Sequence, residues 1–242
     1  MGAQSAAAAT KTGNVPRGCP ALGDSRGVDW PLLRSLTDAE RHELLSLGRR
    51  RRFGRNEVIC HEGDPADSLH LVASGHLTIR ISLPSGDAAT VNVLGPGSSW
   101  GELALLRADG TRTATVTSLE PAETIAIPAS AFQQLCRRRP EVQRTLAVIL
   151  AERVDELSRR LLEMSYVGLD RRVHRRLLEL AESYPDAVVP LTQSQLADLT
   201  GGTRPTVNQI LQRLADQGIV EIGRGRVAVR DLAALRRKAG TA

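Results

Sequence analysis

The feature that most constrains the fold is a change of hydrophobic period near residue 140. Between residues 57 and 127, short apolar or alternating runs are separated by Gly- and Pro-bearing turns at intervals of about ten residues, which is typical of a small β-sandwich or barrel. From residue 141 to about residue 167 the period becomes helical. The sequence therefore predicts an α+β protein in which a β domain is followed by a long helix.

The long helix carries an apolar seam in which hydrophobic residues recur every seven positions. The residues expected at this seam are Leu150, Val154, Leu157, Leu161 and Met164. A helix of this length extends for about 40 Å. The seam could pack on the β domain of its own chain, but the strict heptad favours a second identical helix. We therefore expect a homodimer that is held together by this helix.

The segment after the long helix predicts a winged helix–turn–helix. Thr192 and Thr203 are the expected N-caps of two helices, which are separated by the tight turn "TGG". Pro205 lies near the start of the second helix, where a missing backbone N–H costs little. The following stretch "IVEIGRGRVAVR" predicts a two-stranded wing with a Gly-Arg-Gly turn.

The net charge of +5 lies entirely in the C-terminal third of the chain. Residues 171–242 contain 12 Lys and Arg against 7 Asp and Glu, whereas residues 1–170 contain 20 of each class. This distribution favours a polyanion partner for that segment, and a solvated basic surface is the alternative; the charge alone does not decide between them. Arg, Asn and Gln can make bidentate contacts with base edges. The candidate DNA-contacting residues are Thr192, Thr203, Arg204, Thr206, Asn208, Gln209, Arg213, Arg224 and Arg226. A helical hairpin for protein contacts is the alternative.

The stretch "GELALLRADGTRTATV", residues 101–116, places an acidic and a basic residue in a hairpin that otherwise reads as buried. Buried charges cost several kcal/mol each unless they are paired or bind a ligand. Glu102 and Arg112 therefore either pair with each other or hold a polar ligand. Backbone N–H groups at a helix start, together with one Arg, form a phosphate cradle, and a carboxylate can accept hydrogen bonds from sugar hydroxyls. The ligand reading is thus a nucleotide site, and the alternative is an ion pair that closes the barrel.

Roughly residues 30–232 resemble the Crp/Fnr family, which contains the catabolite activator or cyclic-AMP receptor proteins. The resemblance is carried by "VICHEGDPADSLHLVASGHLTI", by "GELALL" with "RTA" at the family's spacing, and by "LTQSQLADLTGGTRPTVNQIL". It implies that Glu102 binds the ribose of a cyclic nucleotide, while Arg112 and Thr113 bind the cyclic phosphate. Gly101 and Leu103 would contribute backbone groups. The resemblance further implies that the long helix relays ligand binding to the helix–turn–helix.

Two segments depart from the family pattern, one in the long helix and one in the recognition helix. Where the cyclic-AMP receptor offers Thr-Ser to the adenine, this chain has Leu157 and Ser158, of which Ser158 could still reach a base. In the recognition helix, Pro205 replaces the family's Glu and Gln209 replaces its later Arg. The first departure affects base selectivity and the second affects the DNA sequence that is read.

The resemblance divides the chain into four segments. These are a flexible N-terminal arm (1–28), a sensor domain like those that bind cyclic nucleotides (29–139), a dimerisation helix (140–168) and a winged helix–turn–helix (169–242). The fold expected for the sensor domain is a β-barrel of the double-stranded β-helix or jelly-roll type.

The expected function is that of a cytoplasmic transcription regulator, with no enzymatic activity, metal or prosthetic group and no membrane span. Its expected partners are double-stranded DNA, a cyclic nucleotide (cyclic AMP rather than cyclic GMP), a second copy of the chain and RNA polymerase. Two alternatives stay open. The pocket could be vestigial or repurposed, or the sensor could act on a protein partner. Cys136 precedes "RRR", which could lower its pKa and make it a redox switch.

Overall fold

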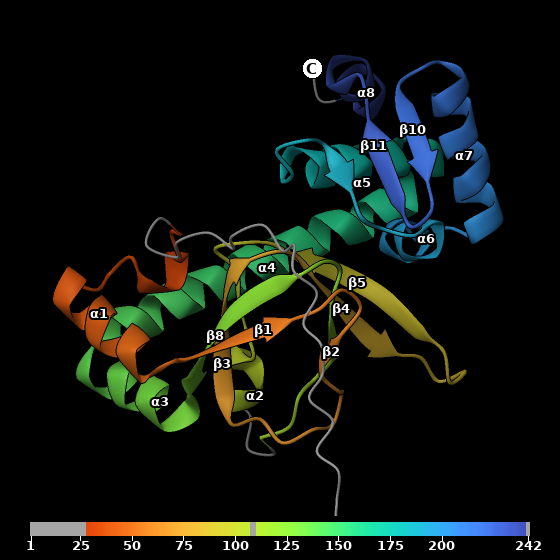
Figure 1. Cartoon of the computed structure of the whole chain (residues 1–242). Coiled ribbons are helices and arrows are strands. Elements are labelled where there is room, and N and C mark those ends of the chain that lie inside the picture. Colours follow the sequence, from red (N-terminus) through yellow and green to blue (C-terminus); the bar gives the residue numbers. More distant parts are fainter. Residues whose placement is uncertain (1–27, 107–109, 241–242) are drawn as a thin grey trace, which may run out of the picture.

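The computed structural model describes residues 28–106 and 110–240, so the expected arm lies outside the described residues except for Val28. The described chain forms a β domain, a long helix that runs along it, and a C-terminal domain of helices with a small sheet (Figure 1). The expected α+β class and the order of its parts are confirmed.

Two four-stranded antiparallel sheets form the β domain. The strands of the first sheet, in spatial order, are β1 (Arg49–Phe53), β8 (Ala122–Pro128), β3 (Ser68–Ser74) and β6 (Ser99–Trp100). Those of the second are β2 (Val58–Cys60), β7 (Thr115–Ser118), β4 (Leu77–Ser82) and β5 (Ala88–Leu94). Strands distant in sequence are neighbours in space, as the jelly-roll expectation requires. Val72, Leu77 and Trp100 belong to the core of this domain.

The run of four arginines at residues 49–52 forms most of the strand β1. All four side chains are exposed on β1, the edge strand of the first sheet. Arg50 and Arg52 lie two residues apart and therefore on the same face. Both pair with the buried Glu123 of β8, at 2.7 and 3.0 Å. Charged side chains suit an edge strand because they discourage pairing with another sheet edge.

Helices cover the outer face of the first sheet. They are η2 (Pro31–Leu33), α1 (Asp38–Leu47), α3 (Ala129–Arg138) and α4 (Pro140–Tyr166), while α2 (Glu102–Leu106) follows β6. Thr37 caps α1 in a capping box with Glu40. The buried side chains of α4, Val142 and Leu146, both lie in its first half and pack against the β domain.

The C-terminal domain has a core shared by its helices and a three-stranded sheet. Its elements are α5 (Leu169–Glu182), β9 (Val188–Val189), α6 (Gln193–Thr200), α7 (Arg204–Asp216), β10 (Val220–Gly223), β11 (Arg226–Val229) and α8 (Leu232–Ala239). The expected two-stranded wing gains β9 as a third strand, since β9 pairs with β11 and buries Val189. Leu196 of α6 packs with Val207 and Leu211 of α7.

The C-terminal domain contacts the β domain at several points (Figure 1). The backbone N–H of Thr90 in β5 donates to the carboxylate of Asp198 in α6, at 3.1 Å. The ring of His76 stacks on Tyr184, with ring centroids 4.0 Å apart. Leu119 of the β domain belongs to the C-terminal core cluster. Strands of the β domain are therefore in direct contact with the first helix of the helix–turn–helix.

Candidate functional sites

A cavity of about 360 Å³ lies between the second sheet, α2 and α4. It lies in the size range of small-molecule sites. The expected ligand-binding residues Gly101, Glu102, Leu103, Arg112 and Thr113 all line it. The fold thus brings the two halves of the 101–116 stretch together around a single space.

Gly101 is the residue that lets Arg112 lie against the backbone. Its φ of +94° lies in the left-handed region that favours glycine. A Cβ atom at this position would come within 2.3 Å of Arg112 Nη1 and 3.0 Å of the Ser68 carbonyl oxygen. The turn between β6 and α2 therefore requires glycine, and any side chain would displace the guanidinium.

Arg112 is held in place but not fully hydrogen bonded. It is 6% exposed, its Nη2 donates to Ser68 Oγ at 3.2 Å, and its guanidinium carbon lies 5.1 Å from the centroid of the Trp100 ring. Its Nη1 is buried without a hydrogen-bond partner among the described residues. A buried donor left unsatisfied costs about 1–3 kcal/mol, and more when it is charged. This group suits an anionic ligand.

Glu102 pairs with Arg153 of α4 and not with Arg112. Glu102 is 1% exposed, and its Oε2 has no hydrogen-bond partner within the described chain. Arg153 also donates through Nη2 to the Ser99 carbonyl oxygen, at 2.7 Å. The alternative of a Glu102–Arg112 ion pair that closes the barrel is therefore wrong. A free acceptor and a free donor remain in the same cavity.

His70 lies behind this site and is neutral. It stacks on Trp100, with ring centroids 4.2 Å apart, and contacts Ser68 Oγ at 3.2 Å and Thr124 Oγ1 at 3.1 Å. Burial lowers the pKa of His70 to about 3, with the positive charge of Arg112 contributing in the same direction. A neutral imidazole fits beside a guanidinium because it adds no second cation there.

Ser158 does not line this cavity and is exposed on α4, whereas its neighbour Leu157 lines the cavity. The sequence analysis missed three polar lining residues of α4, namely Arg153, Glu156 and Arg160. Their spacing of three and four residues was a signal for one helix face.

The helix–turn–helix is built by local capping. Thr192 accepts from the backbone N–H of Gln195 at the start of α6, and α6 ends at Gly201, whose φ is +64°. Thr203 accepts from the backbone N–H of Thr206 at the start of α7. These caps terminate one helix and begin the next within a short turn. They fix the angle between α6 and α7.

The candidate DNA-contacting residues on α7 differ in how exposed they are and in whether their side chains already have partners. Thr203, Arg204, Thr206 and Gln209 are exposed. Asn208 accepts a hydrogen bond from Gln193 at 2.8 Å. The exposed Arg213 forms an ion pair with Asp170 at 2.5 Å. The first turn of α7 is therefore the part whose side chains are most accessible to a partner.

A groove of about 440 Å³ runs between the start of α6, the start of α7 and the wing. Four of the candidate residues line it, namely Thr192, Arg204, Arg224 and Arg226. Arg204 and Arg226 are exposed. The tip of the wing also contacts the β domain, because Arg55 donates to the carbonyl oxygen of Gly225 at 3.0 Å. The groove concentrates positive charge where helix and wing meet, which suits a phosphate backbone.

Comparison with known proteins finds matches to both the β domain and the C-terminal domain. Residues 50–139 match the cyclic nucleotide-binding domain family, and residues 171–238 match the Crp-like helix-turn-helix domain family. The cyclic AMP receptor protein of Thermus thermophilus is 34% identical over 205 residues, which are 85% of this chain and 94% of that protein. The chain belongs to the Crp/Fnr family.

Two further relatives extend this comparison of the Crp/Fnr chain. The CRP-like cAMP-activated global transcriptional regulator of Mycobacterium tuberculosis is 28% identical over 194 residues, covering 77% of this chain and 86% of that protein. The crystal structure of a CRP/FNR-family transcriptional regulator from Thermus thermophilus is 26% identical with a TM-score of 0.65, and the match covers 79% of this chain and 98% of that one.

The family membership settles the class of function. The Crp/Fnr chain is a DNA-binding transcription regulator with a cyclic nucleotide-binding domain, and not an enzyme. Within the described residues, no helix is long and apolar enough to span a bilayer.

The expectation that the arginines lower the pKa of Cys136 in this Crp/Fnr chain is wrong. Burial raises the pKa of the half-buried Cys136 thiol instead of lowering it. Arg137, Arg138 and Arg139 follow it on α3 and at its end, but Arg138 and Arg139 pair with Glu43 and Glu40 of α1. A thiol with a raised pKa is mostly protonated and reacts slowly, so the structure does not favour a redox role.

Proposed function

We propose that cyclic AMP binds in the cavity beside α2 and thereby controls the affinity of α7 for double-stranded DNA. The observation that carries this proposal is the pair of buried, unsatisfied groups in one cavity, Arg112 Nη1 and Glu102 Oε2. One is a cationic donor and the other an acceptor. A cyclic nucleotide supplies the complement of both, because it joins an anionic phosphate to a sugar hydroxyl.

The contacts follow from where the groups lie. Arg112 and Thr113 bind the cyclic phosphate, with the backbone at Gly101 and Leu103 beside it. Glu102 accepts the ribose hydroxyl through Oε2, while its Oε1 stays with Arg153 of α4. The ligand thus completes a chain of contacts from the β domain to the long helix, which is the physical basis for a relay to the DNA-binding domain.

The choice of cyclic AMP over cyclic GMP is supported by the relatives, whose names include cyclic AMP. In this chain the base would meet Leu157, which lines the cavity, and apolar residues of the second sheet such as Ile79 and Val91. Ser158 is exposed and does not line the cavity of its own chain. We place its contact with the base across a dimer seam.

A homodimer formed through α4 is supported by a stripe of apolar side chains in solvent. Val154, Leu157, Leu161 and Met164 are 60%, 62%, 65% and 48% exposed. Such a contiguous stripe on one helix marks an interaction surface. Leu150 differs from these four, because it already packs in part against the β domain of its own chain.

The DNA partner is contacted by the first turn of α7 and by the wing. Arg204 reads a base edge, and Arg224 and Arg226 contact phosphates. The working location is the cytoplasm, because DNA is the target. RNA polymerase is proposed as a further partner on family grounds alone.

Calorimetric titration with cyclic AMP and with cyclic GMP tests the sensor assignment. We expect saturable binding of cyclic AMP that is tighter than that of cyclic GMP, and tighter binding of a DNA site when cyclic AMP is present. If neither nucleotide binds at millimolar concentration while DNA binding persists, the pocket is vestigial or repurposed. If no genomic fragment is shifted in a gel under any condition, the sensor acts on a protein partner.

The seam is tested by changing Val154→Glu together with Leu161→Glu, which places four carboxylates in one apolar interface. Unpaired charges there should split the dimer. The matched control is Thr145→Glu with Arg159→Gln, which changes the net charge of α4 equally outside the seam and should leave the dimer intact. Sedimentation velocity provides the measurement, and an unchanged dimer in the seam variant would move the interface elsewhere.

A further inference from the structure

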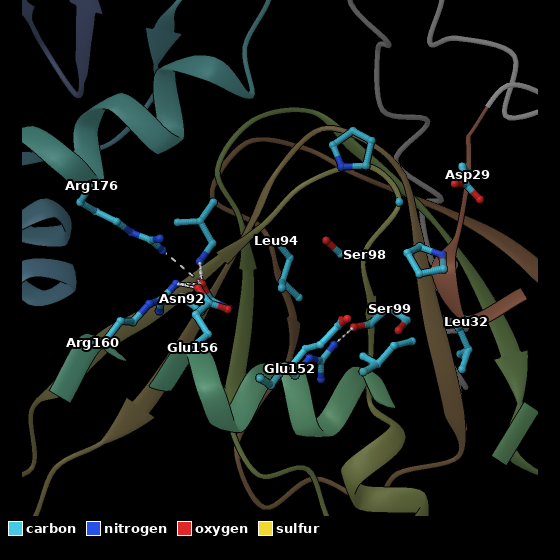
Figure 2. A pocket seen from close by; sticks show the side chains of 16 residues that line it. Asp29, Leu32, Asn92, Leu94, Ser98, Ser99, Glu152, Glu156, Arg160 and Arg176 are labelled. Carbon is cyan, nitrogen blue, oxygen red and sulfur yellow. Dashed lines mark hydrogen bonds and ion pairs between the residues drawn. The ribbon is translucent and has the colours of Figure 1, made fainter. Parts of the chain in front are cut away.

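A second cavity, of about 450 Å³, lies next to the nucleotide cavity and between the two domains. Its walls come from the segment around η2, from β5 and the turn after it, from α4, and from Arg176 of α5 (Figure 2). Six residues line both this cavity and the nucleotide cavity and therefore lie between the two spaces, namely Asn92, Leu94, Ser99, Arg153, Glu156 and Arg160.

One end of this cavity holds two arginines that converge on one neutral acceptor. Arg160 of α4 and Arg176 of α5 both donate through Nη2 to Oδ1 of Asn92, at 3.4 and 3.2 Å (Figure 2). Each arginine also pairs with a carboxylate of its own helix, Glu156 for Arg160 and Glu179 for Arg176. A side-chain amide carries no charge, so Asn92 does not neutralise the two guanidiniums that meet on it.

The Arg176 guanidinium is the less satisfied of the two. Its side chain is 12% exposed, and its Nε is buried without a hydrogen-bond partner among the residues the structure describes. Burial lowers the pKa of Arg176, and the nearby charge of Arg160 lowers it further. An anion that reaches both guanidiniums would relieve this repulsion and accept from the free donor.

The rest of the cavity lining includes apolar and acidic side chains. Leu32, Leu94 and Ile149 supply apolar walls, and Asp29 and Glu152 supply acceptors. Figure 2 shows Asp29 and Leu32 on the side opposite Arg160 and Arg176. A cavity of this size holds far more than one phosphate ion. The acceptors suit the hydroxyl groups of a ligand body.

We propose that this cavity binds a small phosphate ester with a hydroxylated body, whose phosphate lies between Arg160 and Arg176. The site joins β5, α4 and α5, so its occupation would hold the DNA-binding domain against the β domain in the arrangement seen here. Arg160 and Asn92 line both cavities, but the proposal does not depend on Arg112 or Glu102, which line the nucleotide cavity alone.

Titration of the full-length chain tests the site, with inorganic phosphate and glycerol 3-phosphate as probes and chloride of matched ionic strength as the reference. We expect both probes to raise the melting temperature above the chloride reference, and glycerol 3-phosphate to bind more tightly. Arg160→Gln and Arg176→Gln should each weaken binding by about tenfold or more, since a hydrogen bond to a charged group is lost. Arg159→Gln and Arg171→Gln remove the same charge from exposed positions on α4 and α5 and should not change it.

Asn92→Asp keeps the proposal falsifiable if an arginine variant does not fold. This change keeps the shape of the side chain and places a carboxylate between the two guanidiniums. It should hold or raise the melting temperature without probe, and weaken probe binding by about tenfold or more, because the internal anion occupies the place of the phosphate. A purely structural role of Asn92 would leave the response to the probes unchanged.

Arg112→Ala separates this site from the nucleotide cavity. It should retain the response to both probes. The proposal is overturned if neither probe acts beyond chloride, if the response survives in Arg160→Gln and Arg176→Gln, or if it disappears in Arg112→Ala alone. Equal affinity for the two probes would overturn the proposal of a phosphate ester, because the site would then recognise only the phosphate ion. Failure of cyclic AMP to bind would refute the proposed function without touching this site.

Discussion

The proposed nucleotide cavity and the proposed DNA-facing surface both contain arginines that suit a phosphate group, but in opposite settings. Arg112 is 6% exposed and is positioned by Gly101, Ser68 and Trp100. Arg204 is exposed and lines an open groove. A buried charge interacts strongly with a ligand and is weakly screened by salt, whereas exposed charges contribute small, salt-dependent increments. The same side chain should therefore be indispensable in one region and one of several contributors in the other.

The largest effect is expected for Arg112→Ala, which removes the buried donor at the centre of the cavity. Binding of cyclic AMP should weaken by about 100-fold or more, because a charge-assisted contact in a buried site is lost. Calorimetry measures the affinity, and thermal melting checks that the fold persists. Arg144→Ala, an exposed change on α4, is the control. If Arg112→Ala binds cyclic AMP about as tightly as the native chain does, the buried arginine is not indispensable and the two regions do not differ in this respect.

The buried region should also respond to acid through His70. The folded chain keeps His70 neutral down to pH about 3, whereas an unfolded histidine takes up a proton below about 6.5, so the unfolded state binds more protons in this window. Stability should therefore fall as the pH falls, by about 2 kcal/mol between pH about 6.5 and about 5 for this group. Urea unfolding across this range should show a flatter profile for His70→Gln. Identical slopes in both proteins would mean that another group sets the acid response.

On the exposed side, Arg204→Ala is expected to have a moderate effect. Loss of one bidentate base contact should cost about 1–3 kcal/mol and relax the preference at one base pair per half-site. Selection of binding sites by the native chain and by the variant measures this preference. The same consensus from both proteins would show that Arg204 does not read a base, whatever happens to the affinity.

The smallest effect is expected for the wing. Arg224→Ala and Arg226→Ala should weaken binding to all DNA sequences alike, because phosphate contacts carry no sequence information. Each change should reduce the slope of log affinity against log salt by about one unit. Affinities measured on specific and random duplexes over a range of salt concentrations provide the test. A loss of affinity confined to one DNA sequence would mean that the wing arginine contacts a base and not the phosphate backbone.

Much of the fold and of both sites was predictable from short stretches of sequence. The Thr192 and Thr203 caps, the Gly201 turn and the helical period of α4 are local signals, each set by hydrogen bonds or spacing within a few residues. The wing's third strand was missed, because β9 contributes only two residues and pairs with a strand that lies beyond both helices of the helix–turn–helix. The strand formed by the arginine run is likewise not a local feature, since it exists through pairing with β8.

The sequence by itself determined which residue types surround the nucleotide cavity, because Gly101, Glu102 and Arg112 lie within one short stretch of the chain, residues 101–112. Only the tertiary structure decided how they are paired. Glu102 meets Arg153, 51 positions away, and Asn92 meets Arg176, 84 positions away. Such pairs depend on how α4 and α5 pack against the β domain, and packing sums many weak contacts that no short stretch encodes. Local hydrogen bonds therefore allow the helices and strands to be predicted from the sequence, while long-range packing determines which groups the buried charges pair with.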